Sequence, residues 1–259
     1  MAGRFSSVRA LTMPQAVFIA DDFGLSESVN RAILRAHTHG ALTGASLLPG
    51  GPALAHAVEL ARAHPTLAIG WHVQLCDSRP LTRAAWPWPD SPLRAGLALG
   101  WGRHREFLTA ELAAQWRAFQ ATGLSCAFVN GHHHLHVHPA VLRGLRRLLP
   151  ADFAGWLRGF GVRLFGRPTP GSAQLAALVA PLARRGLVRS GFRLSETLWG
   201  LDRLHAMQAA EIRAALAKLP PGSHEFVFHP RTEGDQDSQA LADLAHSTAS
   251  SGKLSATPR

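Results

Sequence analysis

The sequence contains no tyrosine, only two cysteines and no long uninterrupted apolar segment. A helix that crosses a membrane needs roughly 18 to 20 consecutive apolar residues, so no membrane-spanning helix is expected. Residues 1–14 lack the continuous apolar core of a secretory signal, which favours a cytoplasmic protein. Met13 is an alternative start, because the structured pattern begins just after it.

Cysteine spacing also argues against a disulfide-stabilised or cysteine-ligated fold. Cys76 and Cys126 lie far apart and neither belongs to a Cys-x-x-Cys motif. Such residues are more often small buried side chains than a disulfide or a metal-binding pair, and they fit a reducing compartment.

Acidic residues are scarce, with 17 against 27 basic residues and a formal net charge of +10. An excess of this size is typical of proteins that bind nucleic acid or an anionic membrane. However, the basic residues are nearly all arginines scattered through alanine- and leucine-rich segments, with no basic stripe interleaved with aromatics. We therefore expect no nucleic-acid partner, whereas peripheral contact with a membrane and the oligomeric state stay open.

A hydrophobic content of 46% in 259 residues excludes a disordered chain. Short apolar runs at 16–20, 43–48 and 67–75 predict buried strands, and residues 26–40 and 54–63 predict the helices between them. This alternation is typical of an α/β fold with a parallel sheet.

The middle of the chain breaks this alternation. Residues 83–103 hold three tryptophans, three prolines and three glycines, which predicts a long loop or lid. Further helices are expected at 106–121, 140–149, 173–185 and 206–218, and strands at 127–130 and 225–228. No repeat or linker is found, so we expect one domain over 14–246, an extension at 1–13 and a flexible tail at 247–259.

Polar residues follow four of the predicted strands: the pair Asp21–Asp22, His72, the segment 132–138, and His229. In parallel α/β folds the catalytic groups gather at the carboxyl ends of the strands, whether the sheet is open or closed into a barrel. A lone histidine such as His72 or His229 is more often a buried structural residue. Four polar sites in register instead predict a pocket.

Adjacent carboxylates such as Asp21 and Asp22 repel each other and are costly inside a protein unless a cation or hydrogen bonds compensate them. Consecutive residues of a strand face opposite ways, so both reach one pocket only where the strand is ending. A solvated turn closed by Phe23 and Gly24 is the alternative. The kinase motif Asp-Phe-Gly is excluded, because no glycine-rich nucleotide loop or His-Arg-Asp loop accompanies it.

Four histidines recur at alternate positions, so a continuing strand would place them on one face. They are His132, His134, His136 and His138. Neutral imidazole is a common metal ligand, and we expect at least one of these residues to bind a metal. A catalytic site keeps about three protein ligands, so the others would orient ligands or contact substrate. A surface histidine tract is the alternative.

Four motifs in consistent order carry a family resemblance. They are residues 19–26 (Ile-Ala-Asp-Asp-Phe-Gly-Leu-Ser), Gly70-x-His72, residues 130–139 (Asn-Gly-His-His-His-Leu-His-Val-His-Pro) and Glu225-x-x-x-His229-Pro230. Together they resemble the YdjC-type carbohydrate deacetylases, from about residue 17 to about residue 246. That family includes chitooligosaccharide deacetylases and hopanoid-biosynthesis-associated deacetylases.

The resemblance implies a distorted (β/α) barrel of the TIM type that removes an N-acetyl group from an amino sugar. It implies one divalent metal on Asp22, His72 and His132, with Asp21 as general base and His229 as candidate general acid. The metal would be Mg²⁺ by resemblance, while the ligand types alone also suit Zn²⁺. A chitooligosaccharide and a lipid-linked, for example hopanoid-linked, N-acetylglucosamine are both candidate substrates.

Two departures from the family pattern bear on these roles. Arg231 follows His229-Pro230 where the family usually has a small residue, and the tryptophan-rich middle loop has no counterpart that aligns. Trp86, Trp88 and Trp101 could stack on sugar rings, or could pack within their own loop. A metal-dependent phosphoesterase on a barrel and a non-catalytic, histidine-rich metal-binding protein are the alternative functions.

Overall fold

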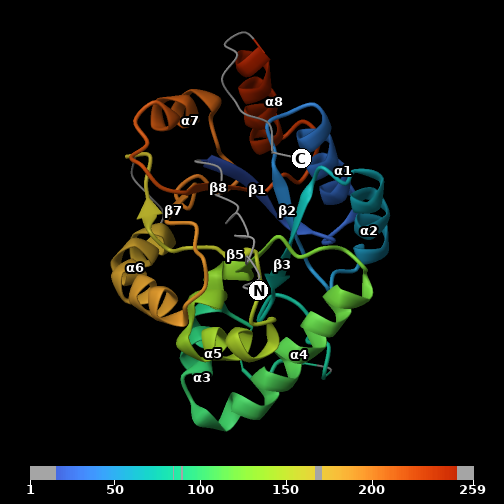
Figure 1. The fold of residues 1–259 in the computed structure, drawn as a ribbon, viewed down its shortest axis with the longest axis vertical. Coiled ribbons are helices and arrows are strands. Elements are labelled where there is room, and N and C mark those ends of the chain that lie inside the picture. Colours follow the sequence, from blue (N-terminus) through green and yellow to red (C-terminus); the bar gives the residue numbers. More distant parts are fainter. Residues whose placement is uncertain (1–15, 84, 89, 167–170, 250–259) are drawn as a thin grey trace, which may run out of the picture.

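The computed structural model describes residues 16–83, 85–88, 90–166 and 171–249, in which helices surround a parallel sheet (Figure 1). The sheet order is β5-β4-β3-β2-β1-β8-β7-β6. The strands are β1 Ala16–Phe23, β2 Gly44–Leu47, β3 Ala68–Val73, β4 Phe128–Gly131, β5 Trp156–Leu157, β6 Val162–Arg163, β7 Thr197–Trp199 and β8 His224–Phe228. Leu157 of β5 also forms a parallel bridge with Leu194, ahead of β7. The sheet therefore curls into the predicted distorted barrel of a single α/β domain.

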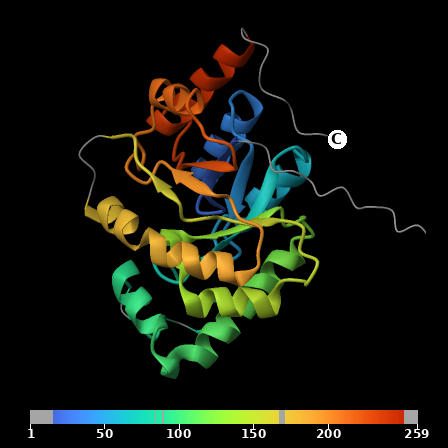
Figure 2. The same ribbon diagram turned by 60° about the vertical axis from the view of Figure 1, so that its left-hand side comes forward.

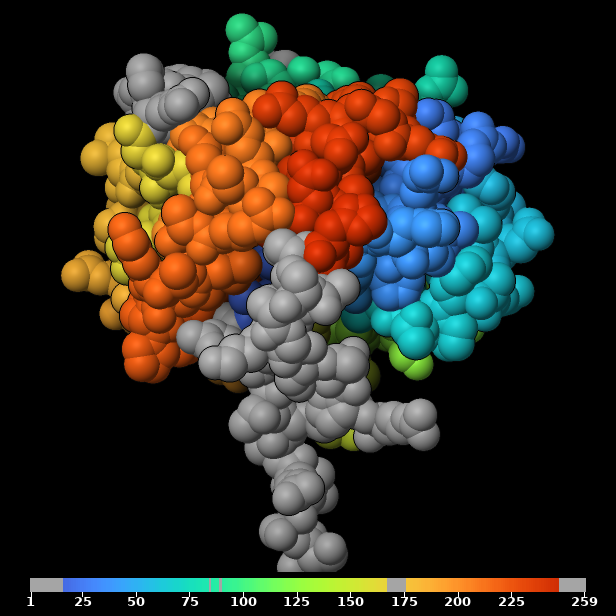
Figure 3. Space-filling model, turned by 90° about the horizontal axis from the view of Figure 1, so that it is seen from above, coloured from blue at the N-terminus to red at the C-terminus, as the bar shows by residue number. Residues whose placement is uncertain are grey.

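The helices lie outside the sheet in both ribbon views (Figures 1 and 2). They are α1 Glu27–Thr38, α2 Leu54–Ala63, α3 Pro92–Leu99, α4 Arg105–Ala121, α5 Pro139–Leu148, α6 Gly171–Ser190, α7 Ala209–Leu216 and α8 Gln236–Ala249, with short 3₁₀ segments η1 Gly102–His104 and η2 His132–Val137. Neighbours pack in turn around the barrel, and Figure 3 shows α7, α8, α1 and α2 side by side. Among the described residues, no helix is both long and apolar enough to cross a bilayer.

Local sequence explains where the helices that frame the site begin. The Ser26 hydroxyl accepts a hydrogen bond from the Val29 N–H and so caps α1. His138 does the same for α5, where its Nδ1 accepts from the Ala140 N–H and Pro139 occupies the first turn. Helix α1 therefore starts a few residues after the polar end of β1, and α5 starts directly after η2.

Several expectations for the second half of the chain were wrong. The histidine run does not continue β4 as a strand: it turns into η2, because His133 and His134 adopt left-handed backbone, with φ of 48° and 58°. The expected loop at 83–103 contains α3. Strands β5, β6 and β7 were missed because two or three residues are too short to show a period. Helix α8 was also not expected.

Alternation along β1 divides its side chains between two environments. Phe18 and Ala20 pack in the large core that includes the helices, whereas Val17 and Ile19 form a separate inner cluster with Phe128. Gly70 makes room for this cluster, since a Cβ at residue 70 would lie 2.3 Å from the Phe128 ring. The inner positions that follow along the strands carry the polar residues of the candidate site.

The predicted extension at 1–13 and most of the predicted tail at 247–259 lie outside the described residues. Helix α8 runs to Ala249.

Candidate functional site

An irregular end of β1 brings the adjacent residues Asp21 and Asp22 to the same side of the strand. The pairing of β1 with β2 shifts register between Ala20 and Phe23, and Asp22 has a φ of 68°. This irregularity turns both carboxylates to the same side, with Asp21 3% and Asp22 6% exposed. Left-handed backbone costs a non-glycine residue about 1 kcal/mol, and aspartate tolerates it better than most. The end of β1 thus carries two buried carboxylates, and the backbone of Asp22 is strained.

His72, near the end of β3, has one ring nitrogen fixed by hydrogen bonds. Its Nδ1 lies 2.6 Å from Oδ1 of Asn130 and 3.2 Å from the Ser46 hydroxyl. Because Asn130 donates through Nδ2 to Asp21, its Oδ1 is the acceptor, and Nδ1 of His72 carries the proton. The other nitrogen, Nε2, faces Oδ1 of Asp22 at 3.4 Å, and Asp21 and Asp22 raise the pKa of His72 against the effect of burial.

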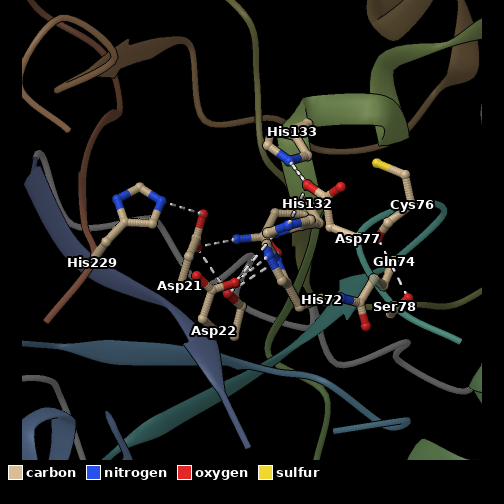
Figure 4. A network of polar contacts seen from close by, with 12 residues as sticks. Asp21, Asp22, His72, Gln74, Cys76, Asp77, Ser78, His132, His133 and His229 are labelled. Carbon is tan, nitrogen blue, oxygen red and sulfur yellow. Dashed lines mark hydrogen bonds and ion pairs between the residues drawn. The ribbon is translucent and has the colours of Figure 1, made fainter. Parts of the chain in front are cut away.

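His132 opens η2 and reaches the same carboxylate from the neighbouring strand end. Its Nδ1 lies 3.2 Å from Oδ1 of Asp22, and its ring meets that of His72 edge to face with centroids 5.6 Å apart. The chain leaves strand geometry after Gly131, and this turn brings His132 to Asp22. Figure 4 shows Asp22, His72 and His132 pointing toward one another.

These three residues fit a cation. One donor atom from each lies within 4.8 Å of the others. Oδ1 of Asp22 and Nε2 of His72 are buried and have no hydrogen-bond partner, which is costly for polar atoms unless something else binds them. Burial alone would raise the pKa of Asp22, but His132 and His72 hold it well below its usual range. A carboxylate and two imidazoles are a common ligand set for a divalent metal.

Asp21 lies beside this group, and four hydrogen bonds hold its carboxylate in place. Its Oδ1 accepts from the Ser46 hydroxyl at 2.8 Å and from Asn130 Nδ2 at 2.9 Å. Arg158, directly after β5, donates to both oxygens, at 2.6 and 2.8 Å. Burial opposes ionisation, yet Arg158 and His72 lower the pKa of Asp21. Asp21 is thus a permanently charged carboxylate held in one orientation.

Arg158 is itself completely buried, and a second carboxylate compensates it. Its Nε donates to Glu225 of β8 at 2.5 Å, and the other oxygen of Glu225 accepts from the Ser195 hydroxyl at 2.9 Å. Although burial disfavours the guanidinium, Asp21 and Glu225 raise the pKa of Arg158. The barrel interior therefore contains a buried Asp–Arg–Glu chain that fixes Asp21.

His229 approaches Asp21 from the end of β8. Its Nε2 lies 3.8 Å from Oδ2 of Asp21, and burial lowers its pKa to about 4. Its backbone is anchored, since the N–H donates to Asp237 at 2.7 Å and the carbonyl contacts His205 Nδ1 at 3.1 Å. Arg231, the departure from the family pattern, donates to the other nitrogen of His205 at 3.3 Å. His229 is thus a neutral imidazole whose backbone is held by Asp237 and His205.

The remaining histidines of the run lie outside the metal group. His136 is buried, its Nε2 contacts the Arg158 carbonyl at 3.1 Å, and burial lowers its pKa to about 3. His134 packs against Phe160 and His136, and burial also lowers its pKa. His138 caps α5. None of these three side chains supplies a donor atom to the group of Asp22, His72 and His132.

The tryptophans of the middle loop pack chiefly with each other. The rings of Trp86 and Trp88 stack at 5.5 Å, and both meet Phe107 edge to face. Their indole N–H groups donate to the carbonyls of Ser78 and Leu75. Trp101 is 56% exposed, with Arg103 over its ring. The structure does not bring these rings into the metal group.

Sequence reasoning missed the residues that hold Asp21 in place. Arg158 follows a two-residue strand that has no readable period, and Ser46 lies inside a predicted strand as an ordinary small residue. Asn130 and Glu225 stand within the quoted motifs, and the place of Asn130 near the carboxyl end of β4 was the available signal for it. Asp77, after β3, was also missed; its Oδ2 lies 3.7 Å from Nε2 of His132.

Two relatives of known sequence are both carbohydrate deacetylases. The chain is 39% identical over 134 residues to a carbohydrate deacetylase of Brevibacillus brevis, covering 48% of this chain and 50% of that one. It is 38% identical over 146 residues to a carbohydrate deacetylase of Geobacillus stearothermophilus, covering 52% and 56%. The chain thus spans about half the length of these relatives.

A solved structure shares the fold over nearly the full chain. It is a protein from Enterococcus faecalis V583 assigned to cellobiose-phosphate cleavage, with a TM-score of 0.63, 19% identity, and coverage of 94% of this chain and 97% of that one. The model of the YdjC-like protein family matches residues 15–255. That match includes every residue of the candidate site, and the chain belongs to the YdjC-like protein family.

Proposed function

We propose that the protein is a metal-dependent hydrolase that removes an N-acetyl group from an amino sugar. One observation carries the proposal: two buried acceptor atoms without hydrogen-bond partners, Asp22 Oδ1 and His72 Nε2, converge with His132 beside the charged Asp21. The relatives that match half of the chain are carbohydrate deacetylases, which supports an acetylated sugar as substrate.

One divalent cation would be held by Asp22, His72 and His132, which leaves room for water and substrate. When bound, it polarises the acetyl carbonyl and lowers the pKa of a water molecule. Mg²⁺ is favoured by family resemblance, and Zn²⁺ by the two imidazoles. The Nδ1–H of His72, fixed by Asn130, keeps Nε2 available as a ligand.

Asp21 would accept the proton of the attacking water. Arg158 keeps it ionised, so it is always in the accepting form, although a carboxylate with a lowered pKa is a weak base. His229, at 3.8 Å, starts neutral and would receive that proton from Asp21. It would then give the proton to the amine as the C–N bond breaks. One proton thus moves from water to Asp21, to His229 and to the leaving group, and both residues return to their starting states.

We further propose a lipid-linked substrate, taken at the cytoplasmic surface of a membrane. Two helices that contact η2, α3 and α6, expose large apolar side chains to solvent. They include Leu93 and Leu97 on α3 and Leu178 and Leu182 on α6, each more than 60% exposed. Helix α3 also carries Arg94, the second half of α6 carries Arg184, Arg185 and Arg189, and neither helix has an acidic residue. An apolar and cationic surface suits an anionic bilayer, and the free thiols of Cys76 and Cys126 suit a reducing compartment.

The deciding experiment is acetate release by the full chain, supplied with Mg²⁺ or Zn²⁺, from N,N′-diacetylchitobiose and from a glucosamine-bearing lipid acetylated at nitrogen. Acetate release that stops with a chelator and in Asp21→Asn supports the proposal. No release from either substrate would overturn it. A phosphate monoester serves as the control substrate: its cleavage, with two or more metals per chain, would instead indicate the phosphoesterase alternative.

A further inference from the structure

A second cluster of metal-ligating side chains lies next to the first. Cys76 and Asp77 follow β3 directly, and His133 is the second residue of η2. One donor atom from each of the three lies within 4.8 Å of the others. Figure 4 shows the Cys76 sulfur, the Asp77 carboxylate and the His133 ring at one side of the pocket. None of these residues has a part in the proposed reaction.

Strained backbone aims two of the three side chains at this point. Asp77 has a φ of 54° and His133 a φ of 48°. Each such conformation costs a non-glycine residue of order 1 kcal/mol and persists only where its surroundings impose it. The two side chains form a close hydrogen bond with each other, and the Asp77 N–H donates to Asp90. The loop after β3 is therefore held against η2 at this cluster.

The donor types favour one class of cation. Thiolate and imidazole are preferred by zinc and other thiophilic metals, whereas Mg²⁺ requires mostly oxygen ligands. Tetrahedral zinc places its nitrogen, oxygen and sulfur ligands about 3.3 to 3.6 Å from one another, and the donor atoms of this cluster lie within 4.8 Å of one another. The Cys76 side chain is buried and faces inward to this cluster instead of solvent.

We propose that Cys76, Asp77 and His133 form a second cation site, separate from Asp22, His72 and His132, for a thiophilic divalent metal of the zinc class. Binding replaces the contact between Asp77 and His133 by bonds from both to the cation, and the Cys76 thiol loses its proton to solvent. The cation then ties the loop after β3 to η2.

The two sites share the ring of His132. Its Nδ1 lies 3.2 Å from Asp22 Oδ1 in the first group, and its Nε2 lies 3.7 Å from Asp77 Oδ2 in the second. A cation on Asp77 withdraws that carboxylate from His132 and adds positive charge beside the first group. If the first site holds a metal as proposed, the second metal weakens it, and the coupling is reciprocal.

Cobalt titration of the metal-free full chain tests this proposal, because Co²⁺ bound to a thiolate gives a charge-transfer absorption in the near ultraviolet. The absorption should appear in the wild type, disappear on addition of Zn²⁺ and persist with excess Mg²⁺. It should be lost in Cys76→Ser. Cys126→Ser is the matched control, since it removes the only other cysteine of the chain, and it should keep the absorption.

Two further variants separate the sites. Asp22→Asn should retain the thiolate absorption while it loses the first metal, and His133→Ala should weaken Co²⁺ binding at the thiolate at least about tenfold. If Cys76→Ser does not fold, the Co²⁺ affinity of His133→Ala decides whether the second site exists. Absence of the absorption in the wild type, its survival in Cys76→Ser, or its loss in Cys126→Ser or Asp22→Asn would overturn the second site. Turnover is not measured, so failure of the proposed deacetylation is a separate result.

Discussion

Arg158 holds Asp21 in a two-pronged hydrogen bond, from Nη1 to Oδ2 at 2.6 Å and from Nη2 to Oδ1 at 2.8 Å, inside the barrel. The two strand ends that meet there are far apart in sequence. A planar guanidinium can satisfy both oxygens of one carboxylate and still reach a second acid through Nε. The orientation of the proposed base therefore depends on an arginine that never touches the metal group.

The first prediction concerns this arginine. Arg158→Lys keeps the positive charge but loses the paired N–H donors that bind both oxygens of Asp21. We therefore expect kcat for acetate release to fall at least about tenfold, with a smaller change in KM. Arg158→Ala leaves two buried carboxylates unpaired and should destabilise the fold by about 3 to 5 kcal/mol. Steady-state kinetics and denaturant unfolding measure the two effects. Arg62→Lys, on α2, is the control, and equal kcat in Arg158→Lys and wild type would contradict the role.

The second prediction compares two adjacent isosteric substitutions at the end of β1. Asp22→Asn removes a charged ligand, so metal affinity should fall by more than about 100-fold, beyond the cost of losing a supporting residue. Asp21→Asn should keep one metal per chain and lose turnover. The metal content after desalting measures metal binding. The rate of acetate release measures turnover separately. Full activity of Asp21→Asn on its true substrate would exclude it as the base.

The part of the site that could be predicted from sequence lies at the ends of long apolar strands. Apolar residues directly precede Asp21 in β1, His72 in β3 and His229 after β8, and parallel strands bring their carboxyl ends to one edge. The bulge at Asp22 could not be predicted, because no side-chain pattern marks a left-handed aspartate inside a strand.

The histidine run shows the limit of periodicity. Four histidines at alternate positions favour a strand face, yet η2 replaces it, so only His132 reaches the metal group. His136 turns inward to the Arg158 carbonyl and His138 caps α5. The deciding factor is the tertiary surroundings of residues 133 and 134, which impose backbone angles that local sequence does not favour. Arg158 was missed for a related reason, since its strand has only two residues.

The third prediction tests the apolar surface beside the site. Leu178→Glu with Leu182→Glu places two charges on exposed positions of α6 without disturbing the core. Co-sedimentation with vesicles of anionic lipid should fall at least about tenfold, since each change removes buried apolar area and adds repulsion. Wild type should not sediment with zwitterionic vesicles. Glu59→Gln on α2 is the control, and unchanged sedimentation of the double variant would contradict a membrane role for α6.

The fourth prediction follows from a buried histidine that the reaction does not use. His136 is fully buried, and burial lowers its pKa from 6.5 to about 3. Between these values the unfolded chain binds the proton and the folded one does not, so stability rises with pH in this range and is lost as pH falls. His136 alone should reduce the free energy of unfolding by about 1.4 kcal/mol per pH unit well inside that window.

His136→Gln removes the titrating group and keeps a donor for the Arg158 carbonyl. We expect the wild type to be the more stable protein at about pH 7 and to lose its advantage between about pH 6 and pH 4. Denaturant unfolding with a chelator present measures this difference without interference from bound metal. The exposed His39→Gln variant is the control. If wild type and His136→Gln lose stability in parallel over that range, then His136 titrates normally in the folded protein and burial does not hold it neutral.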